Sequence, residues 1–126
     1  MKKSKTPIQQ AIEQLKQNPE YITRVTEWAD YMGYEEESLF RRHFKKAFEK
    51  EPKKVLTSIR LERITRDLRQ NQCSCFEVAR KYGLPDDNAL NGWLKRHMSC
   101  TPTQVKTMSK EEFHEIWEQT RSEIVE

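Results

Sequence analysis

The sequence predicts an all-α chain of two similar helical units, joined by a long helix and followed by one more helix. Charged residues make up 34% of the 126 residues and hydrophobic ones 35%, with only 3 glycines, a balance that suits amphipathic helices with charged outer faces. Apolar residues recur at intervals of three and four, the period of a helix. Their pattern also returns after fifty positions, which indicates a duplicated unit.

This internal repeat relates residues 25–55 to residues 75–105 with one constant offset. Identical pairs include Glu27 and Glu77, Ala29 and Ala79, Gly33 and Gly83, Pro52 and Pro102, and Val55 and Val105. The pairs that keep only apolar character are Val25 and Cys75, Trp28 and Val78, Phe40 and Leu90, Phe44 and Leu94, and Phe48 and Met98. Because core-forming positions are kept throughout, the two copies should fold alike.

Each copy predicts two helices joined by a tight turn. Ser74 and Glu77 have the spacing of a capping box, which places a helix start at Ser74. Gly83, like its counterpart in the first copy, stands where a helix stops and the chain needs a left-handed residue. Asp86 and Asp87 can cap the helix that follows. The helices expected from these signals cover residues 25–32, about 36–48, 74–82 and 88–98, so each copy is a helix-turn-helix unit.

Helical spacing separates an apolar face from a polar face on the second helix of each unit. The apolar faces are expected to consist of Phe40, Phe44 and Phe48, with Ala47 beside them, and of Leu90, Leu94 and Met98, flanked by Trp93. The polar faces collect Ser38, Arg41, Arg42, Lys45 and Lys46 in the first unit, and Asn88, Asn91, Gly92, Lys95 and Arg96 in the second. The apolar faces suit core packing, so the polar faces are the candidates for a binding function.

Two further helices follow from local signals. Pro52 suits the first turn of a helix, and apolar residues follow it at helical spacing as far as Leu68. Ser109 and Glu112 repeat the capping-box spacing ahead of a last amphipathic segment. The chain is therefore expected to divide into a first helix-turn-helix unit over residues 8–51, a linker helix over 52–70, a second unit over 71–106 and an acidic C-terminal helix over 107–126.

Charge is distributed unevenly, although the net charge is only +3. Residues 107–126 hold two basic residues and six glutamates, a balance of −4, so the preceding residues carry +7. Eleven Lys or Arg residues lie between Arg41 and Arg69, which indicates a polyanionic partner. The chain lacks both an apolar run of membrane-spanning length and a signal-peptide pattern. We therefore expect a cytoplasmic protein whose three cysteines are reduced.

Catalytic and metal-binding patterns find little support. Residue types that bind zinc occur at four positions whose spacing fits no compact motif, namely Cys73, Cys75, His97 and Cys100. The repeat also assigns Cys75 to a core position. His43 and His114 have no suitable catalytic partner nearby in the sequence, and no glycine-rich phosphate loop is present. We expect neither an enzyme nor a bound metal or cofactor.

In these motifs the chain resembles the DNA-binding domain of the AraC/XylS family of transcription regulators, over roughly residues 8–106. That family joins two helix-turn-helix units by a long helix with an arginine and a leucine in its middle, and Arg60-Leu61 stand eight and nine residues after Pro52. The second-unit signature is matched by Glu77-Val-Ala-x-x-x-Gly-Leu84, by Leu94 and by Thr101-Pro102-x-x-Val105-Lys106. The resemblance implies a transcription regulator whose partner is double-stranded DNA.

The resemblance also implies roles for the polar faces. In the first unit it implies that Ser38, Arg41 and Arg42 face DNA bases, and that Lys45 and Lys46 face phosphates. In the second unit the corresponding positions are Asp87, Asn88, Asn91 and Gly92, with Lys95 and Arg96 on the same face. Arginine can pair with guanine and asparagine with adenine. Two units held at the ends of a long helix can meet successive major grooves, roughly 34 Å apart.

Three departures from the family pattern distinguish the two units. The first unit has one more residue before its second helix, in the segment Glu35-Glu36-Glu37, whose charges repel nearby phosphates. Gly92 stands where the family usually carries arginine, which removes a contact and costs about 1 kcal/mol of helix stability. Glu49 stands where the family usually has glycine. We therefore expect the first unit to be the stronger DNA reader.

A protein-interaction module is the alternative function. Under this hypothesis the two units are a scaffold, and the acidic turn and the C-terminal amphipathic helix bind another protein, with RNA polymerase as one candidate. The favoured interpretation instead packs that helix on the domain through Phe113, Ile116 and Trp117. The family usually adds a ligand-binding or dimerisation domain, but none fits within these residues, so we expect a stand-alone regulator or a fragment of a larger one.

Overall fold

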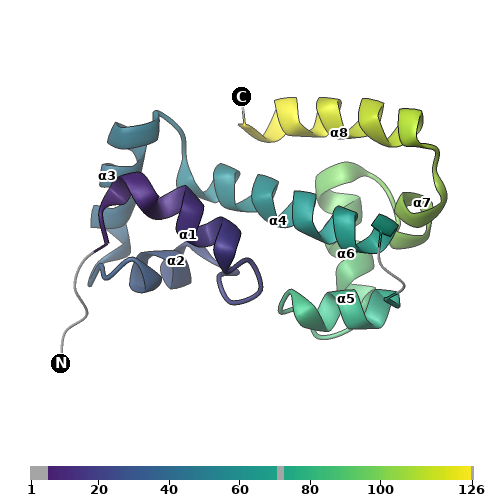
Figure 1. Ribbon diagram of the computed structural model, residues 1–126, viewed down its shortest axis with the longest axis horizontal. Helices are drawn as coiled ribbons and strands as arrows, with labels where there is room; N and C mark the ends of the chain where they lie inside the picture. Colours follow the sequence, from purple (N-terminus) through teal and green to yellow (C-terminus); the bar gives the residue numbers. More distant parts are fainter. Residues whose placement is uncertain (1–5, 71–72, 126) are drawn as a thin grey trace.

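The structure is a computed structural model that describes residues 6–70 and 73–125. Within these residues it contains helices and no strand, which confirms the all-α prediction. A short 3-10 helix, Ile8–Gln10, precedes α1 (Ala11–Gln17), α2 (Val25–Tyr31), α3 (Glu37–Phe48), α4 (Pro52–Gln70), α5 (Cys75–Lys81), α6 (Asp87–Met98), α7 (Pro102–Thr107) and α8 (Lys110–Val125), as Figure 1 shows. The expected start of the second unit at residue 71 and the expected end of the last helix at residue 126 lie outside the described residues.

The helices of the two units begin and end close to the expected positions because the capping signals act locally. Ser74 Oγ accepts a hydrogen bond from the Glu77 amide at 3.1 Å, and Glu77 Oε1 accepts one from the Ser74 amide at 3.0 Å. Gly83 adopts the left-handed conformation with φ 81°, as does its counterpart in the first unit. Asp86 alone caps α6, through a hydrogen bond from a first-turn amide, so Asp87 is already helical.

Helix α4 divides the interior into two hydrophobic cores. In its first half, Val55, Leu56 and Ile59 pack with residues of α1, α2 and α3. From Leu61 onward its apolar residues pack with α5, α6, α7 and α8. Ile59 and Leu61 are two residues apart, which places them about 200° apart around the helix. Each unit therefore packs on its own face of α4.

Most of the expected core residues are buried, but three are not fully buried. Phe44 and Leu94, at the centres of the two apolar stripes, are completely buried. The expectation for Ala47 is wrong, because it lies about 60° around α3 from Phe44, on an exposed flank. Phe48 and Cys75 are half-buried, since one lies in the last turn of α3 and the other begins α5.

Helix α8 runs back along α4 in the opposite direction and also contacts α6 (Figure 1). Phe113, Ile116 and Trp117 pack against the second core, as the favoured interpretation predicts. Arg69, near the end of α4, holds these side chains of α8 against the core. Its Nη1 donates to two carbonyl oxygens at the end of α7, at 2.7 and 3.0 Å, and its guanidinium lies 4.6 Å from the centre of the Phe113 ring. The last helix therefore completes the second core.

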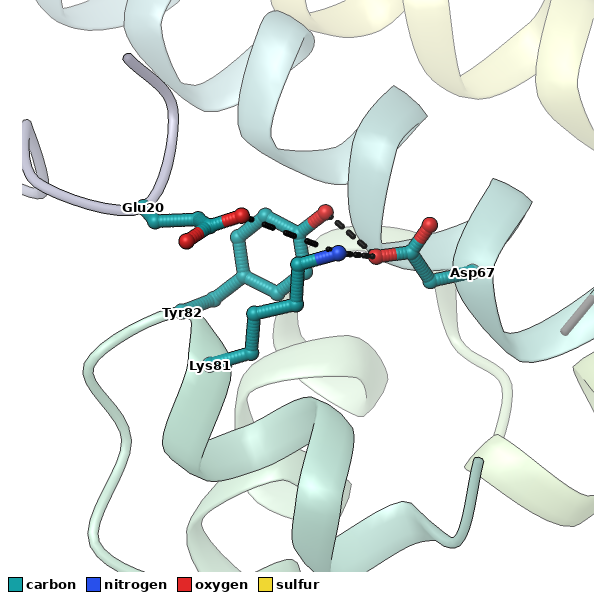
Figure 2. Close-up of polar contacts among 4 residues, drawn as sticks. All are labelled: Glu20, Asp67, Lys81 and Tyr82. Carbon is teal, nitrogen blue, oxygen red and sulfur yellow. Dashed lines mark hydrogen bonds and ion pairs between the residues drawn. The ribbon is translucent and has the colours of Figure 1, made fainter. Parts of the chain in front are cut away.

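A group of polar side chains joins the second unit to α4 and to the first unit (Figure 2). Lys81 Nζ, at the end of α5, lies 2.8 Å from Asp67 Oδ2 of α4 and 3.7 Å from Glu20 Oε1, between α1 and α2. Tyr82 Oη donates to the same oxygen of Asp67 at 2.6 Å. These four residues, called the inter-unit cluster below, connect three segments that lie far apart in the sequence.

The turn of the second unit packs directly against the first unit. A Cβ built at Gly83 would lie 3.0 Å from Thr23 Cγ2, which is tighter than ordinary contact. On the other side of the turn, Arg60 Nη2 of α4 donates a hydrogen bond to the Tyr82 carbonyl oxygen. Because the turn is held between α4 and the segment before α2, the orientation of one unit relative to the other is fixed.

Burial and hydrogen bonding act in opposite directions on Asp67. Burial raises the pKa of Asp67, but hydrogen bonds from Lys81 and Tyr82 together outweigh burial and hold that pKa below its usual value. Burial, helped by the hydrogen bond to Asp67, raises the pKa of Tyr82. The carboxylate is thus ionised and the phenol protonated at neutral pH, as their hydrogen bond requires.

Both second helices end at a non-glycine residue in the left-handed conformation. Glu49 has φ 58° and Ser99, at the equivalent position of the repeat, has φ 59°. An L-residue loses about 1–2 kcal/mol in this conformation. Glycine avoids that loss but costs roughly 0.5–1 kcal/mol in backbone entropy. The duplication therefore extends to the backbone conformation, at some cost in stability.

Replacing Asp67 should destabilise the protein in a pH-dependent way. Asp67→Asn should lower the free energy of unfolding by about 1–3 kcal/mol at pH 7, the cost of a disrupted buried hydrogen bond. Because the folded-state pKa of Asp67 is lowered, its stabilisation is present above about pH 4, the ordinary aspartate pKa, and is lost as the pH falls through the lower folded value. Urea unfolding at pH 7 and pH 3 should show a smaller loss on acidification for the variant than for the parent.

Glu20→Gln is the control for this experiment. The Glu20 side chain is 41% exposed, so its loss should change stability by no more than about 0.5 kcal/mol. Parent-like stability of Asp67→Asn at pH 7 would contradict a structural role for the inter-unit cluster.

Glycine at the end of α3 should stabilise the protein. Glu49→Gly should raise the free energy of unfolding by about 0.5–1 kcal/mol, because the relief of left-handed strain exceeds the added backbone entropy. Ala47→Gly, at an exposed position in the last turn of the same helix, should instead lower it, by up to about 1 kcal/mol. Urea unfolding measures both, and a similar loss in the two variants would rule out strain at Glu49.

Candidate nucleic-acid interface

The outer side of α3 is an exposed basic surface. Its exposed polar residues are Ser38, Arg42, Lys45 and Lys46. The opposite side is fixed by aromatic packing, in which the ring centre of Trp28 lies 5.3 Å from that of Phe40 and 5.0 Å from that of Phe44. Buried aromatic contacts therefore determine the direction in which the basic side chains point.

Arg41 is held apart from this exposed surface. Its Nε forms an ion pair with Glu37 Oε2, one turn earlier in α3, and Thr26 Oγ1 of α2 donates to the other oxygen of Glu37. The hydrogen bonds from Thr26 and Arg41 lower the pKa of Glu37. Arg41 is half-buried as a result. Glu37 is thus paired with Arg41, and Glu35 and Glu36 are exposed.

The outer side of α6 is polar but less basic. Its exposed residues are Asp87, Asn88, Gly92, Lys95 and Arg96. Asn91 is half-buried, and its Oδ1 is buried without a hydrogen bond from any described residue. Arg96 also lines a pocket between the two units. The structure therefore places Asn88, Gly92 and Lys95 on one surface, with Asn91 and Arg96 at its edges.

Gly92 leaves open space in the middle of this surface. A Cβ built there would meet no atom within 4 Å other than the backbone of its own helix. Gly92 is the repeat equivalent of Arg42, which is exposed on α3. Packing does not require glycine here, so the difference between the two units is one of surface chemistry.

The sequence patterns did not identify the residues that orient the two helix-turn-helix units relative to each other. Glu20, Asp67 and Lys81 were not singled out, and Arg60 was noted only through the resemblance. One signal was available, because Asp67 lies three residues after Ile64 on the buried side of a helix. An acid at such a position needs a buried partner. The identity of that partner depends on how α5 packs against α4, which helical periodicity does not predict.

The cysteine and histidine side chains of the described residues do not assemble into a metal-binding site. Cys73 and Cys75 are half-buried and Cys100 is buried, and burial raises the pKa of the Cys100 thiol. Over residues 6–70 and 73–125, no three His, Cys, Asp or Glu side chains lie close enough together to hold a metal ion. In the same part of the chain, no helix has the length and apolarity needed to cross a membrane.

Comparisons with known proteins agree with this architecture. The profile of one protein family, described as a helix-turn-helix domain, matches residues 28–108. Comparison with curated protein sequences found no match. Among solved structures, the C-terminal domain of AraT, a response regulator from Geobacillus stearothermophilus, is 18% identical with a TM-score of 0.66, and the match covers 86% of this chain and 93% of that one.

Two further structures share the fold. The DNA-binding domain of AdpA, a global transcriptional factor solved in complex with a target DNA, is 22% identical with a TM-score of 0.65, covering 80% of this chain and 90% of that one. The C-terminal domain of the two-component response regulator YesN from Fusobacterium nucleatum is 21% identical with a TM-score of 0.60, covering 79% and 93%. The family profile extends from α2 through α7 and so includes α4 and both second helices. The chain therefore belongs to the AraC-type helix-turn-helix family.

Proposed function

We propose that the chain is a sequence-specific DNA-binding transcription regulator that inserts α3 and α6 into successive major grooves. The observation that carries this proposal is the exposed polar side of each helix, with α3 and α6 at opposite ends of α4 (Figure 1). A major groove admits one helix, and the next groove on the same DNA face lies roughly 34 Å away. The 19 residues of α4 span about 28 Å at about 1.5 Å per residue, a comparable length.

The rigidity of the arrangement supports the proposal. The inter-unit cluster and the contact between Gly83 and Thr23 hold the units in one orientation. A preorganised pair of helices loses less entropy on binding than a flexible pair. The AdpA domain, which has the same fold, was solved with a target DNA.

The first unit is proposed to read most of the bases. Arg42 is exposed and forms no ion pair with a described residue, so its guanidinium can pair with guanine. Ser38 joins it, and Lys46 and Lys45 bind phosphates. The ion pair of Lys45 with Glu51, at 3.2 Å, is exposed and costs little to break. Arg41 can reach a base only by leaving Glu37.

The second unit is proposed to contribute fewer base contacts. Asp87 can accept a hydrogen bond from cytosine, and Asn88 and Asn91 can pair with adenine. Lys95 and Arg96 supply charge for phosphates, whereas Gly92 supplies no side chain. The protein-interaction alternative is less well supported, because the apolar side chains that α8 would offer a partner pack on the second core.

Binding selection on random duplexes tests the proposal. The enriched sequence should contain two half-sites separated by one helical turn, about 10–10.5 base pairs. The logarithm of affinity should fall linearly with the logarithm of salt concentration, by about 0.9 units for each phosphate contacted. Weak binding that does not discriminate among sequences would overturn the proposal.

Arg42→Ala should weaken binding to the selected duplex by about 1–3 kcal/mol and relax base preference at one position, because a bidentate contact is lost. Competition assays with single-base variants of the duplex measure both effects. Arg121→Ala, at an exposed arginine of α8, is the matched control and should leave both unchanged. If Arg42→Ala keeps the full preference, a different residue reads that base.

Substitutions of Gly92 should separate helix stability from DNA contact. Gly92→Ala and Gly92→Arg should both raise the stability of α6 by about 1 kcal/mol, because glycine is a poor helix former. Only Gly92→Arg should also bind the duplex more tightly, because it adds a guanidinium where Arg42 stands in the first unit. Equal duplex affinity of the two variants would show that this side of α6 does not face DNA.

A further inference from the structure

A pocket of about 460 Å³ lies between the two helix-turn-helix units. Its walls come from the segment around the start of α2, from α3 and α4, and from the second half of α6. The lining contains no Asp or Glu but five basic residues, which are Arg24, Arg41, Lys53, Arg60 and Arg96. A cleft lined by charges of one sign attracts ligands of the opposite sign.

Arg60 is a buried residue of this pocket with unsatisfied hydrogen-bonding capacity. It is only 7% exposed, and its Nη2 donates to the Tyr82 carbonyl oxygen. Its Nε is buried without a hydrogen-bond partner, and the guanidinium forms no ion pair with a described residue. The guanidinium lies 5.4 Å from the centre of the Trp93 ring. A buried cation without a carboxylate is costly unless an anion completes its surroundings.

Two acids act on these cations, but neither forms an ion pair with Arg60. Glu27 influences Arg60 through its charge, but its Oε1 accepts hydrogen bonds from the amide and hydroxyl of Thr23, at 2.9 and 2.6 Å. Glu37 is paired with Arg41. Basic residues of the pocket also act on His97. Burial lowers the pKa of His97 first, and the charges of three basic neighbours lower it further.

We propose that this pocket binds a phosphate group, with Arg60 and Lys53 as its main ligands. Phosphate presents at least three acceptor oxygens and more than one negative charge, so it can take donors from several walls at once. A guanidinium offers the planar set of donors that suits such an anion. Two sources share this chemistry, a backbone phosphate of bound DNA and the phosphate of a small molecule. The first source rests on the proposed function, whereas the second does not.

An NMR titration of the full chain with inorganic phosphate tests the site without DNA. Saturable shifts are expected for the Trp93 indole N–H and the Arg60 Nε–H. The pKa of His97 should rise as well, because a bound anion stabilises the imidazolium. Sodium chloride at the same ionic strength should produce neither effect.

Lys53→Ala and Lys54→Ala form a matched pair for this titration. Both lysines are exposed in the first turn of α4, but only Lys53 lines the pocket, and neither change removes buried side chains. Lys53→Ala should weaken phosphate binding about two- to fivefold, the effect of one exposed charged contact, and Lys54→Ala should not. Equal weakening by both changes would point to general charge attraction and overturn the site.

Duplex binding by the same pair distinguishes the two sources. For a backbone phosphate, Lys53→Ala should lower the salt slope by about one unit, Lys54→Ala should not, and the duplex should displace inorganic phosphate. For a small molecule, both variants should keep the parent slope and phosphate should stay bound. The proposal is overturned if inorganic phosphate gives no saturable signal and the two variants have the same salt slope as the parent. If binding selection fails but the phosphate titration is positive, the regulator hypothesis is wrong and the phosphate site still holds.

Discussion

Helix α4 is buried against both hydrophobic cores, and the geometry of the two units depends on this double role. A single helix can serve two cores because side chains two positions apart point in nearly opposite directions, and the change of side falls between Ile59 and Leu61. The length of the helix then sets the separation of the units. Their rotation is set by the turn at Gly83, which is held between Thr23 and Arg60. A flexible linker would fix neither quantity.

The two units have the same backbone conformation but differ in surface chemistry, because packing constrains only the buried residues. Glu49 and Ser99 end equivalent helices with nearly the same left-handed φ. Arg42 and Gly92 occupy equivalent exposed positions, but only the first carries a charged side chain. A duplicated unit can therefore lose an exposed charged side chain without losing its fold. The same rigid pairing also creates the basic pocket around Arg60, to which both units contribute walls.

Helix ends and core stripes could be predicted because their signals act within a few residues. The capping hydrogen bonds of Ser74 and Asp86 involve partners three positions away. Errors arose where burial depends on a neighbouring element. Ala47 has the spacing of a core residue, but no periodicity tells which flank of α3 a neighbour covers. The polar faces of α3 and α6 were identified for the same local reason, whereas their contact with DNA remains a prediction.

The sequence by itself determined the two units, the long helix between them and most of the residues that each second helix turns outward, since each follows from local signals or from the fifty-residue repeat. Only the tertiary structure decided that Thr26 of α2 donates a hydrogen bond to Glu37, that Asp67 meets Lys81, and that Arg60 faces a basic pocket without a carboxylate. These outcomes depend on which groups meet when helices pack. Ion pairs and pockets are set by the mutual rotation of those helices, which no local pattern encodes.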